Sequence, residues 1–128
     1  MYPNEPILTV VAPLIDAQIV ETAILLEVNH QSLIATKARR IVRAASDFGA
    51  RRAHNMDAAV YGARAAYIGG VSSTATVLAG KMFGIPVSGT MAHSFVMFYD
   101  NEYDAFKQYA LTYPENTILL VDTYDVLK

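Results

Sequence analysis

The predicted fold is decided by residues 47–70, which read DFGARRAHNMDAAVYGARAAYIGG. The first three residues form a short strand-like break, and two adjacent arginines, Arg51 and Arg52, follow closely. A helix is then expected over about residues 56–67, and the paired glycines behind it are typical of a helix end. A strand that leads into a helix is the repeating unit of parallel sheets, so this segment predicts an α/β architecture.

Outward from this segment, strands and helices are expected to alternate along most of the chain. Further strands are expected over residues 7–12, 85–87 and 117–121. Further helices are expected over residues 14–29 and 32–45, from a cap at 72–74 to about 83 with Gly84 as the stop signal, and over 102–113 with Asn101 as the cap. A helical or loop segment is expected to begin at Met91. About four short strands cannot close an eight-stranded barrel. We therefore predict an α/β fold in which parallel strands alternate with helices in a partial, irregular barrel.

Composition excludes several classes of protein. The chain has 128 residues, 53% of them apolar and 17% charged, and a net charge of −2. One folded domain is expected, whereas a disordered chain and a strongly basic nucleic-acid surface are not. There is no cysteine, and the three histidines lack the spacing of a zinc site, so no metal site is predicted. The chain opens without a signal-like segment and has no apolar run of about 20 residues, so we expect a cytoplasmic protein that makes no membrane contact.

Arg51 and Arg52 form the first candidate site. Each guanidinium presents a planar fork of donors that suits a carboxylate or a phosphate. The nearby aromatic residue, Phe48, could stack on a planar ring. The alternative is a solvated basic turn with Phe48 in the core.

Two further candidates are polar groups beside predicted strands or helices. The hydroxyl groups of residues 72–74, Ser72 among them, could hold a phosphate at a helix N-terminus, or could simply cap that helix. The carboxylate of Asp122 follows the last predicted strand, where such groups bind hydroxyls or metal-bound phosphates. Helix capping would explain Asp122 equally well.

The last candidate is a histidine between small polar residues. Thr90 and Ser94 flank His93 in a segment that is otherwise poor in ionisable groups. The imidazole could act as a nucleophile or carry a proton. A structural histidine whose nitrogens bind backbone carbonyls is the alternative.

Several stretches, in their order and spacing, resemble the nicotinate phosphoribosyltransferase family. The most specific are DFGARR at residues 47–52, GIPVSGTMAHS at 84–94 and VDTYD at 121–125. No single motif decides the resemblance, which extends over almost the whole chain.

The resemblance implies an enzyme of NAD salvage. Such an enzyme condenses nicotinate with 5-phosphoribosyl 1-pyrophosphate to nicotinate mononucleotide, with hydrolysis of ATP as co-substrate. It implies that ATP phosphorylates His93, that Thr90 lines the nicotinate site and that Phe48 stacks on the pyridine ring. Arg51 would lie at the base and phosphate site, Mg²⁺ would accompany the phosphates, and no tightly bound cofactor is expected. The other candidates for substrate binding are Arg52, Ser94, Ser72 and Asp122.

The resemblance also implies a domain organisation. Residues 1–12 would end an N-terminal α/β sandwich domain, and residues 13–128 would form part of an incomplete α/β barrel. Family members are much longer, so we expect a partial chain that is not active alone and that forms a homo-oligomer. Two alternatives stay open: a relative that acts on nicotinamide or quinolinate, and a non-catalytic half-barrel that assembles with a partner or with itself.

Overall fold

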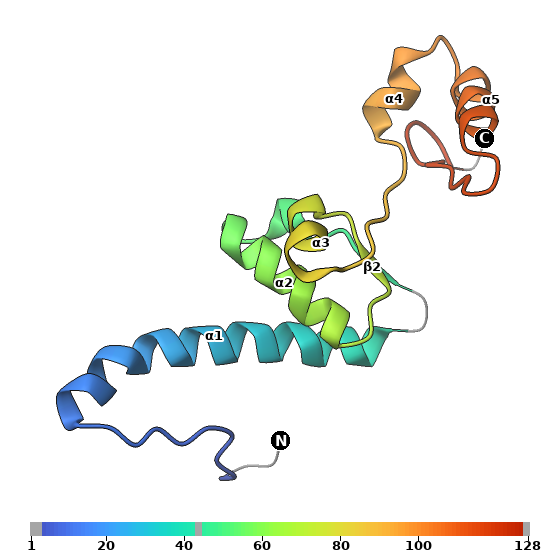
Figure 1. The fold of residues 1–128 in the computed structure, drawn as a ribbon. Helices are drawn as coiled ribbons and strands as arrows, with labels where there is room; N and C mark the ends of the chain where they lie inside the picture. Colours follow the sequence, from blue (N-terminus) through green and yellow to red (C-terminus); the bar gives the residue numbers. More distant parts are fainter. Residues whose placement is uncertain (1–3, 43–44, 127–128) are drawn as a thin grey trace. The chain divides into compact units, whose positions relative to one another are not determined.

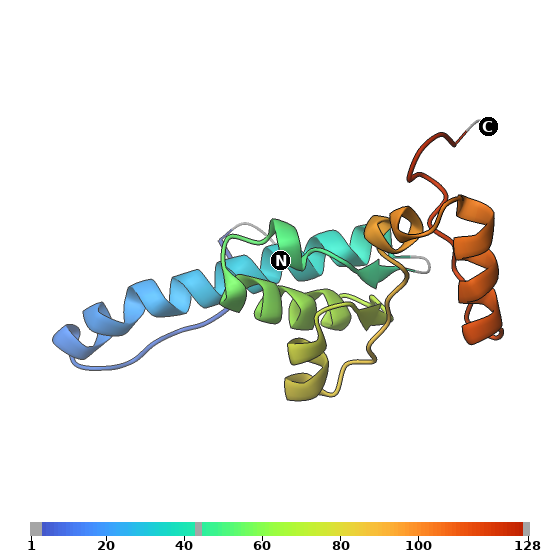
Figure 2. The same ribbon diagram turned by 90° about the horizontal axis from the view of Figure 1, so that it is seen from above.

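The computed structural model describes residues 4–42 and 45–126 and is drawn in two views in Figures 1 and 2. The chain divides into two compact units, residues 1–87 and 88–128. Each unit has its own helices and its own apolar core, and the two are described separately.

The first unit is dominated by one long helix, α1, which covers Leu14–Ile41. Two helices with a break near residue 30 were predicted here, and this prediction is wrong. No glycine or proline lies within α1, and Gln31 at the expected break donates a hydrogen bond of 2.8 Å to Glu27 one turn earlier. A bond between residues four apart supports a continuous helix. Pro13 is the residue immediately before the helix.

The sheet of the first unit is small and parallel. Strand β1 (Ser46–Asp47) pairs with β2 (Ser73–Thr74), so that Asp47 lies beside Thr74. Val87 adds one further parallel bridge to Thr74, which is all that forms of the strand expected at 85–87. Parallel pairing is therefore confirmed. Residues 7–12 form no strand and run beside the first half of α1 (Figure 1).

Residues 72–74 do not cap a helix, which corrects the prediction made for them. Their middle and last residues form β2, and α3 begins only at Val77 and ends at Phe83. Pairing with β1 takes these residues into the sheet, and Thr76 becomes the residue before the helix. Gly84 ends α3 in the left-handed conformation, with φ of 67°, as its position predicted.

Helix α2 (Met56–Ile68) forms the centre of the first unit and agrees with the predicted helix. The Asn55 side chain caps it by accepting a 2.8 Å hydrogen bond from the Ala58 amide. The apolar face of α2 is built mainly from alanines, which allow close packing. Two small clusters result: Val60, Ala63, Ala79 and Ile85 on the side of α3, and Ala38, Ala66 and Val71 on the side of α1.

The second unit contains α4 (His93–Phe98), α5 (Glu102–Thr112) and the segment that follows them. Asn101 caps α5 as predicted, since its side chain accepts a 3.0 Å hydrogen bond from the Asp104 amide. Leu120 of the following segment packs on the cluster of Met91, Val96 and Ala105. The strand expected at 117–121 is not formed, and residues 88–126 contain no other strand with which it could pair.

The described residues therefore have a mixed α/β fold with a two-stranded parallel sheet. This much of the predicted fold class is confirmed, whereas the partial barrel and the domain limits stay predictions. None of the helices in the described ranges combines the length and apolar character needed to cross a bilayer.

Candidate functional site

The end of β1 positions the first group of candidate residues. The Asp47 carboxylate accepts a hydrogen bond of 2.9 Å from the Gly49 amide and one of 2.8 Å from the Thr74 hydroxyl. Thr74 is fully buried, and its hydroxyl also accepts a 3.0 Å bond from the Thr76 amide. The turn after β1 is therefore anchored to β2 at its first residues, and the backbone that leads to the arginines starts from a fixed point.

Phe48 lies on this anchored turn with 50% of its surface exposed. The interpretation of Phe48 as a core residue is therefore wrong, because half of the residue is accessible from solution. Arg51 and Arg52 follow in a short 3-10 helix, η1 (Ala50–Arg52), and both are exposed. The turn thus presents an aromatic ring and two guanidinium groups within five residues of sequence.

Arg52 also lines a cavity of about 450 Å³ between α1, η1 and α2. Lys37, His30 and His54 contribute basic groups to this cavity, and Asp47 contributes a carboxylate. Its floor consists of small residues of α2, among them Gly62 and Ala63.

Ser72 lies just before β2, and its hydroxyl is already engaged. The hydroxyl donates a 3.0 Å hydrogen bond to the Ala45 carbonyl, which also accepts one of 3.0 Å from the Ser72 amide. The side chain therefore helps to join the two strands. A donor used in this way is not available to a phosphate.

The second group of candidates surrounds His93, the first residue of α4. One ring nitrogen, Nδ1, lies 3.2 Å from the Thr123 hydroxyl oxygen, and the other, Nε2, lies 3.9 Å from Asp122 Oδ1. The His93 and Asp122 side chains are 47% and 61% exposed. His93 is thus accessible to a large ligand while each ring nitrogen faces a polar side chain.

The structure brings His93 and Asp122 together, although 28 residues separate them in the sequence. Sequence reasoning missed Thr123, whose only signal is its place beside Asp122 in the VDTYD stretch. Thr90 donates a 3.3 Å hydrogen bond to the Met91 carbonyl, and Ser94 is an exposed residue in the first turn of α4. Both lie within a few residues of His93 on the same segment.

The candidate residues fall into one group in each unit. Phe48, Arg51, Arg52 and Ser72 belong to the first unit, and Thr90, His93, Ser94 and Asp122 belong to the second. The described residues contain no cluster of three or more histidine, aspartate or glutamate side chains able to hold a metal ion.

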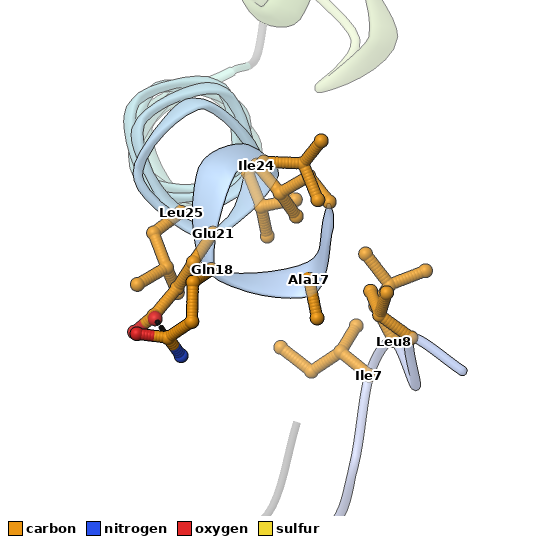
Figure 3. Close-up of a pocket in the computed structure, with 10 residues that line it drawn as sticks. Ile7, Leu8, Ala17, Gln18, Glu21, Ile24 and Leu25 are labelled. Carbon is orange, nitrogen blue, oxygen red and sulfur yellow. Dashed lines mark hydrogen bonds between the residues drawn. The ribbon is translucent and has the colours of Figure 1, made fainter. Parts of the chain in front are cut away.

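A separate apolar groove of about 420 Å³ lies between residues 7–10 and the first half of α1. Ile7 and Leu8 face Ala17 and Ile24 of the helix across it (Figure 3). The polar side chains at its rim, Gln18 and Glu21, bind each other at 3.3 Å. None of the predicted site residues lines this groove, and its chemistry suits apolar side chains rather than phosphates.

Comparison with known proteins gives consistent matches. Residues 44–126 match the model of the nicotinate phosphoribosyltransferase (NAPRTase) family. The whole chain is 57% identical to nicotinate phosphoribosyltransferase of Bacillus subtilis, of which it covers 27%, and 50% identical to nicotinate phosphoribosyltransferase pncB2 of Mycobacterium tuberculosis, of which it covers 28%. A crystal structure of human nicotinic acid phosphoribosyltransferase matches 90% of this chain and 33% of its own, with a TM-score of 0.75 and 29% identity. The chain thus spans little more than a quarter of the length of these curated relatives.

Proposed function

Because the chain belongs to the nicotinate phosphoribosyltransferase family, we propose that it supplies the base-binding and phosphoryl-accepting residues of such an enzyme. The reaction joins nicotinate to 5-phosphoribosyl 1-pyrophosphate, releases pyrophosphate and forms nicotinate mononucleotide, with hydrolysis of ATP. We do not expect complete turnover from these 128 residues alone, because they span 27% of the Bacillus subtilis relative. The proposal includes the partial α/β barrel over residues 13–128, the sandwich domain ending at residue 12, and a cytoplasmic homo-oligomer.

The observation that carries the proposal is the environment of His93. Its imidazole is exposed, so the γ-phosphate of ATP can reach it, and each ring nitrogen has a polar neighbour within 4 Å. A neutral imidazole is a good nucleophile toward phosphorus. A ring that accepts a phosphoryl group gains positive charge, which the Asp122 carboxylate 3.9 Å away would stabilise.

We assign recognition of nicotinate to the turn after β1 and to Thr90. Phe48 is half-exposed on a turn anchored by Asp47, so its ring can stack on a pyridine ring. Arg51 can bind the carboxylate of nicotinate with its planar fork of donors. The two contacts would suit nicotinate, whose ring is flat and whose carboxylate is negatively charged.

The remaining candidates are assigned to the phosphates, except that Ser72 would first have to release its present hydrogen bond. Arg52 and Ser94 are exposed and could donate hydrogen bonds to phosphate oxygens. Ser72 has less support, because its hydroxyl donates to the Ala45 carbonyl. Asp122 is an exposed carboxylate that fits one position around a Mg²⁺ ion whose other ligands are phosphates and water. Such an ion would neutralise phosphate charge during the transfer.

Catalysis would depend on positioning and on electrostatics. Departure of pyrophosphate leaves positive charge on the ribose carbon, and the base must be held flat against that carbon as the charge develops. Residues that hold the base and the phosphates in place contribute through orientation and charge stabilisation. Phosphorylation of His93 would attach a phosphoryl group with two negative charges, and this change could tighten substrate binding.

The direct test is phosphorylation of the chain by ATP radiolabelled at the γ-phosphate. We expect a label that is stable in base and labile in acid, and that is absent from the His93→Ala variant. The His54→Ala variant is the control, because His54 is an exposed histidine of the first unit and should not affect labelling. Wild-type protein that stays unlabelled, or equal labelling of the His93→Ala variant, would contradict the proposal.

A further inference from the structure

The side chains at the two ring nitrogens of His93 differ in what they can donate and accept. Asp122 Oδ1, 3.9 Å from Nε2, belongs to a carboxylate, which only accepts hydrogen bonds when ionised. Thr123 Oγ1, 3.2 Å from Nδ1, belongs to a hydroxyl, which can donate or accept. This asymmetry bears on which nitrogen carries the proton of the neutral ring.

A proton on Nε2 suits both neighbours, whereas a proton on Nδ1 suits only Thr123, whose hydroxyl can accept as well as donate. With the proton on Nε2, the ring points a positive edge at the Asp122 carboxylate, and the Thr123 hydroxyl donates to the lone pair of Nδ1. With the proton on Nδ1, the lone pair of Nε2 would face the carboxylate, and the two negative centres would repel. The carboxylate therefore favours the tautomer with hydrogen on Nε2, and the contact between Thr123 and Nδ1 holds the ring in the orientation that turns Nε2 toward Asp122.

We propose that Thr123 is a positioning residue, which together with Asp122 holds His93 with its proton on Nε2 and makes Nδ1 the nitrogen that accepts the phosphoryl group. The inference rests on the proposed function, in which ATP phosphorylates His93. It adds the identity of the reacting nitrogen and a role for a residue that sequence reasoning did not single out.

The phosphoryl transfer balances without a further reactant. The lone pair of Nδ1 attacks the γ-phosphorus of ATP, the Nδ1–P bond forms, and the bond from that phosphorus to the bridging oxygen breaks. The bonding electrons leave with ADP, and the ring keeps its Nε2 proton and becomes cationic beside Asp122. A hydroxyl rotates freely, so that of Thr123 can turn from Nδ1 to an oxygen of the attached phosphoryl group.

Packing beneath the site explains how exposed side chains keep this geometry. Met91, two residues before His93, belongs to the core of the second unit, and Leu120, three residues before Thr123, packs against the same core. The two segments that carry the pair are thus fixed by apolar contacts next to it. The hydroxyl and the ring have only to adopt the correct rotamers.

The test is NMR of the chain with isotope-labelled histidine, in which the shifts of the two ring nitrogens report which one is protonated. We expect the wild-type His93 ring to be protonated mainly on Nε2. Thr123→Val removes the hydroxyl at nearly constant shape, so the ring is no longer held with Nε2 toward Asp122. The ratio of the Nε2-protonated to the Nδ1-protonated tautomer should fall about fivefold, and labelling by ATP should become about fivefold slower. Thr123→Ser keeps the hydroxyl and should retain both. In labelled protein, the phosphoryl group should be found on Nδ1.

The matched control is Thr112→Val, which removes a hydroxyl of the same unit that donates to the Gln108 carbonyl within α5. It should leave the ring-nitrogen shifts and the labelling rate unchanged. A His93 ring protonated mainly on Nδ1, a phosphoryl group on Nε2, or Thr123→Val indistinguishable from wild type would overturn the inference. The shifts report the tautomer without ATP, so the two proposals can fail separately. If ATP does not label the protein, but His93 shows the expected tautomer and loses it in Thr123→Val, the proposed function is refuted and the positioning role is supported.

Discussion

Asp47 and Thr74 show how a few polar atoms organise the turn on which Phe48 and Arg51 lie. The carboxylate of Asp47 accepts from the Gly49 amide ahead of it and from the Thr74 hydroxyl across the sheet. The aromatic and basic side chains beyond the turn, Phe48 and Arg51, are exposed and follow Asp47 by one and four residues. Their position therefore depends on this pair.

Thr74→Val is expected to destabilise the chain. The substitution removes a buried hydroxyl that donates to Asp47 and accepts from the Thr76 amide. A lost pair of such hydrogen bonds costs about 1–3 kcal/mol of unfolding free energy. Urea unfolding measures this loss, and Thr22→Val, at an exposed position of α1, is the control. Equal stability of the two variants would show that the Asp47–Thr74 bond has no structural weight.

Arg51→Gln is expected to weaken binding of nicotinate to the chain. The loss of a charge-assisted hydrogen bond to the carboxylate should lower the affinity about tenfold or more. Nicotinamide lacks that carboxylate, so its affinity should change little. Equilibrium dialysis with both bases measures the difference, and Arg40→Gln, an exposed arginine of α1, is the control. A parallel loss for both bases would assign Arg51 a role other than carboxylate recognition.

For single residues, the sequence indicated candidate side chains more reliably than the side chains that they contact. It singled out His93 and Asp122 separately, and the structure brings them together. It missed Thr123, because no local pattern marks a threonine that meets a histidine 30 residues earlier. It gave Ser72 a phosphate or capping role, because the same hydroxyl can bind a phosphate, a helix end or, as here, a carbonyl of the neighbouring strand.

Among the elements, α1 and α2 form the frame of the first unit, and Gly69, the residue after α2, lies directly against α1. A Cβ atom at Gly69 would lie 2.6 Å from the Ala35 carbonyl oxygen and 2.8 Å from Ala38 Cβ. Both atoms belong to α1 and cannot move without shifting the helix. The end of α2 can therefore pack against α1 only through a residue that lacks a side chain.

Gly69→Ala is expected to destabilise the first unit by about 1–3 kcal/mol, because the added methyl group forces the two helices apart. Gly62→Ala, within α2 itself, is the control, since its Cβ would meet only His30 Cε1 at an ordinary 3.8 Å. There the gain in helix propensity should stabilise the chain by about 0.5–1 kcal/mol. Thermal unfolding of both variants measures effects of opposite sign, and a shared sign would contradict this account of the helix contact.

Helices were easier to predict than strands for a physical reason. A helix closes its hydrogen bonds within one segment. The N-terminal cap and the apolar periodicity of each helix are therefore enough to predict α2 and α5. A strand depends on a partner elsewhere in the chain. Residues 7–12 and 117–121 have the apolar character of strands but pair with no strand in the described residues, and only β1, β2 and the bridge at Val87 form. The predicted break in α1 failed because polar residues alone do not end a helix.

For the whole molecule, the dominant feature is apolar surface. Many large apolar side chains are exposed, among them Ile19 at 72% and Leu26 at 66% on the first half of α1. These two residues are seven apart and therefore lie on one face of the helix. An exposed apolar stripe of this kind favours association with other protein surfaces.

The 128-residue chain is accordingly expected to self-associate at micromolar concentration. The double variant Ile19→Lys/Leu26→Lys should shift its elution in size-exclusion chromatography toward the monomer. Thr22→Lys/Asn29→Lys adds the same charge at exposed polar positions of α1 with the same spacing, and should leave the elution unchanged. A wild-type chain that elutes as a monomer would contradict the predicted oligomer.

The most direct test of the account is a chimera in which these 128 residues replace the matched segment of the Bacillus subtilis relative, with which they share 57% identity. The account predicts that the folded chimera forms nicotinate mononucleotide from nicotinate and 5-phosphoribosyl 1-pyrophosphate, and that His93→Ala removes the stimulation of this reaction by ATP. A chimera that unfolds at the same temperature as the parent enzyme but forms no product, or one whose response to ATP survives His93→Ala, would contradict it.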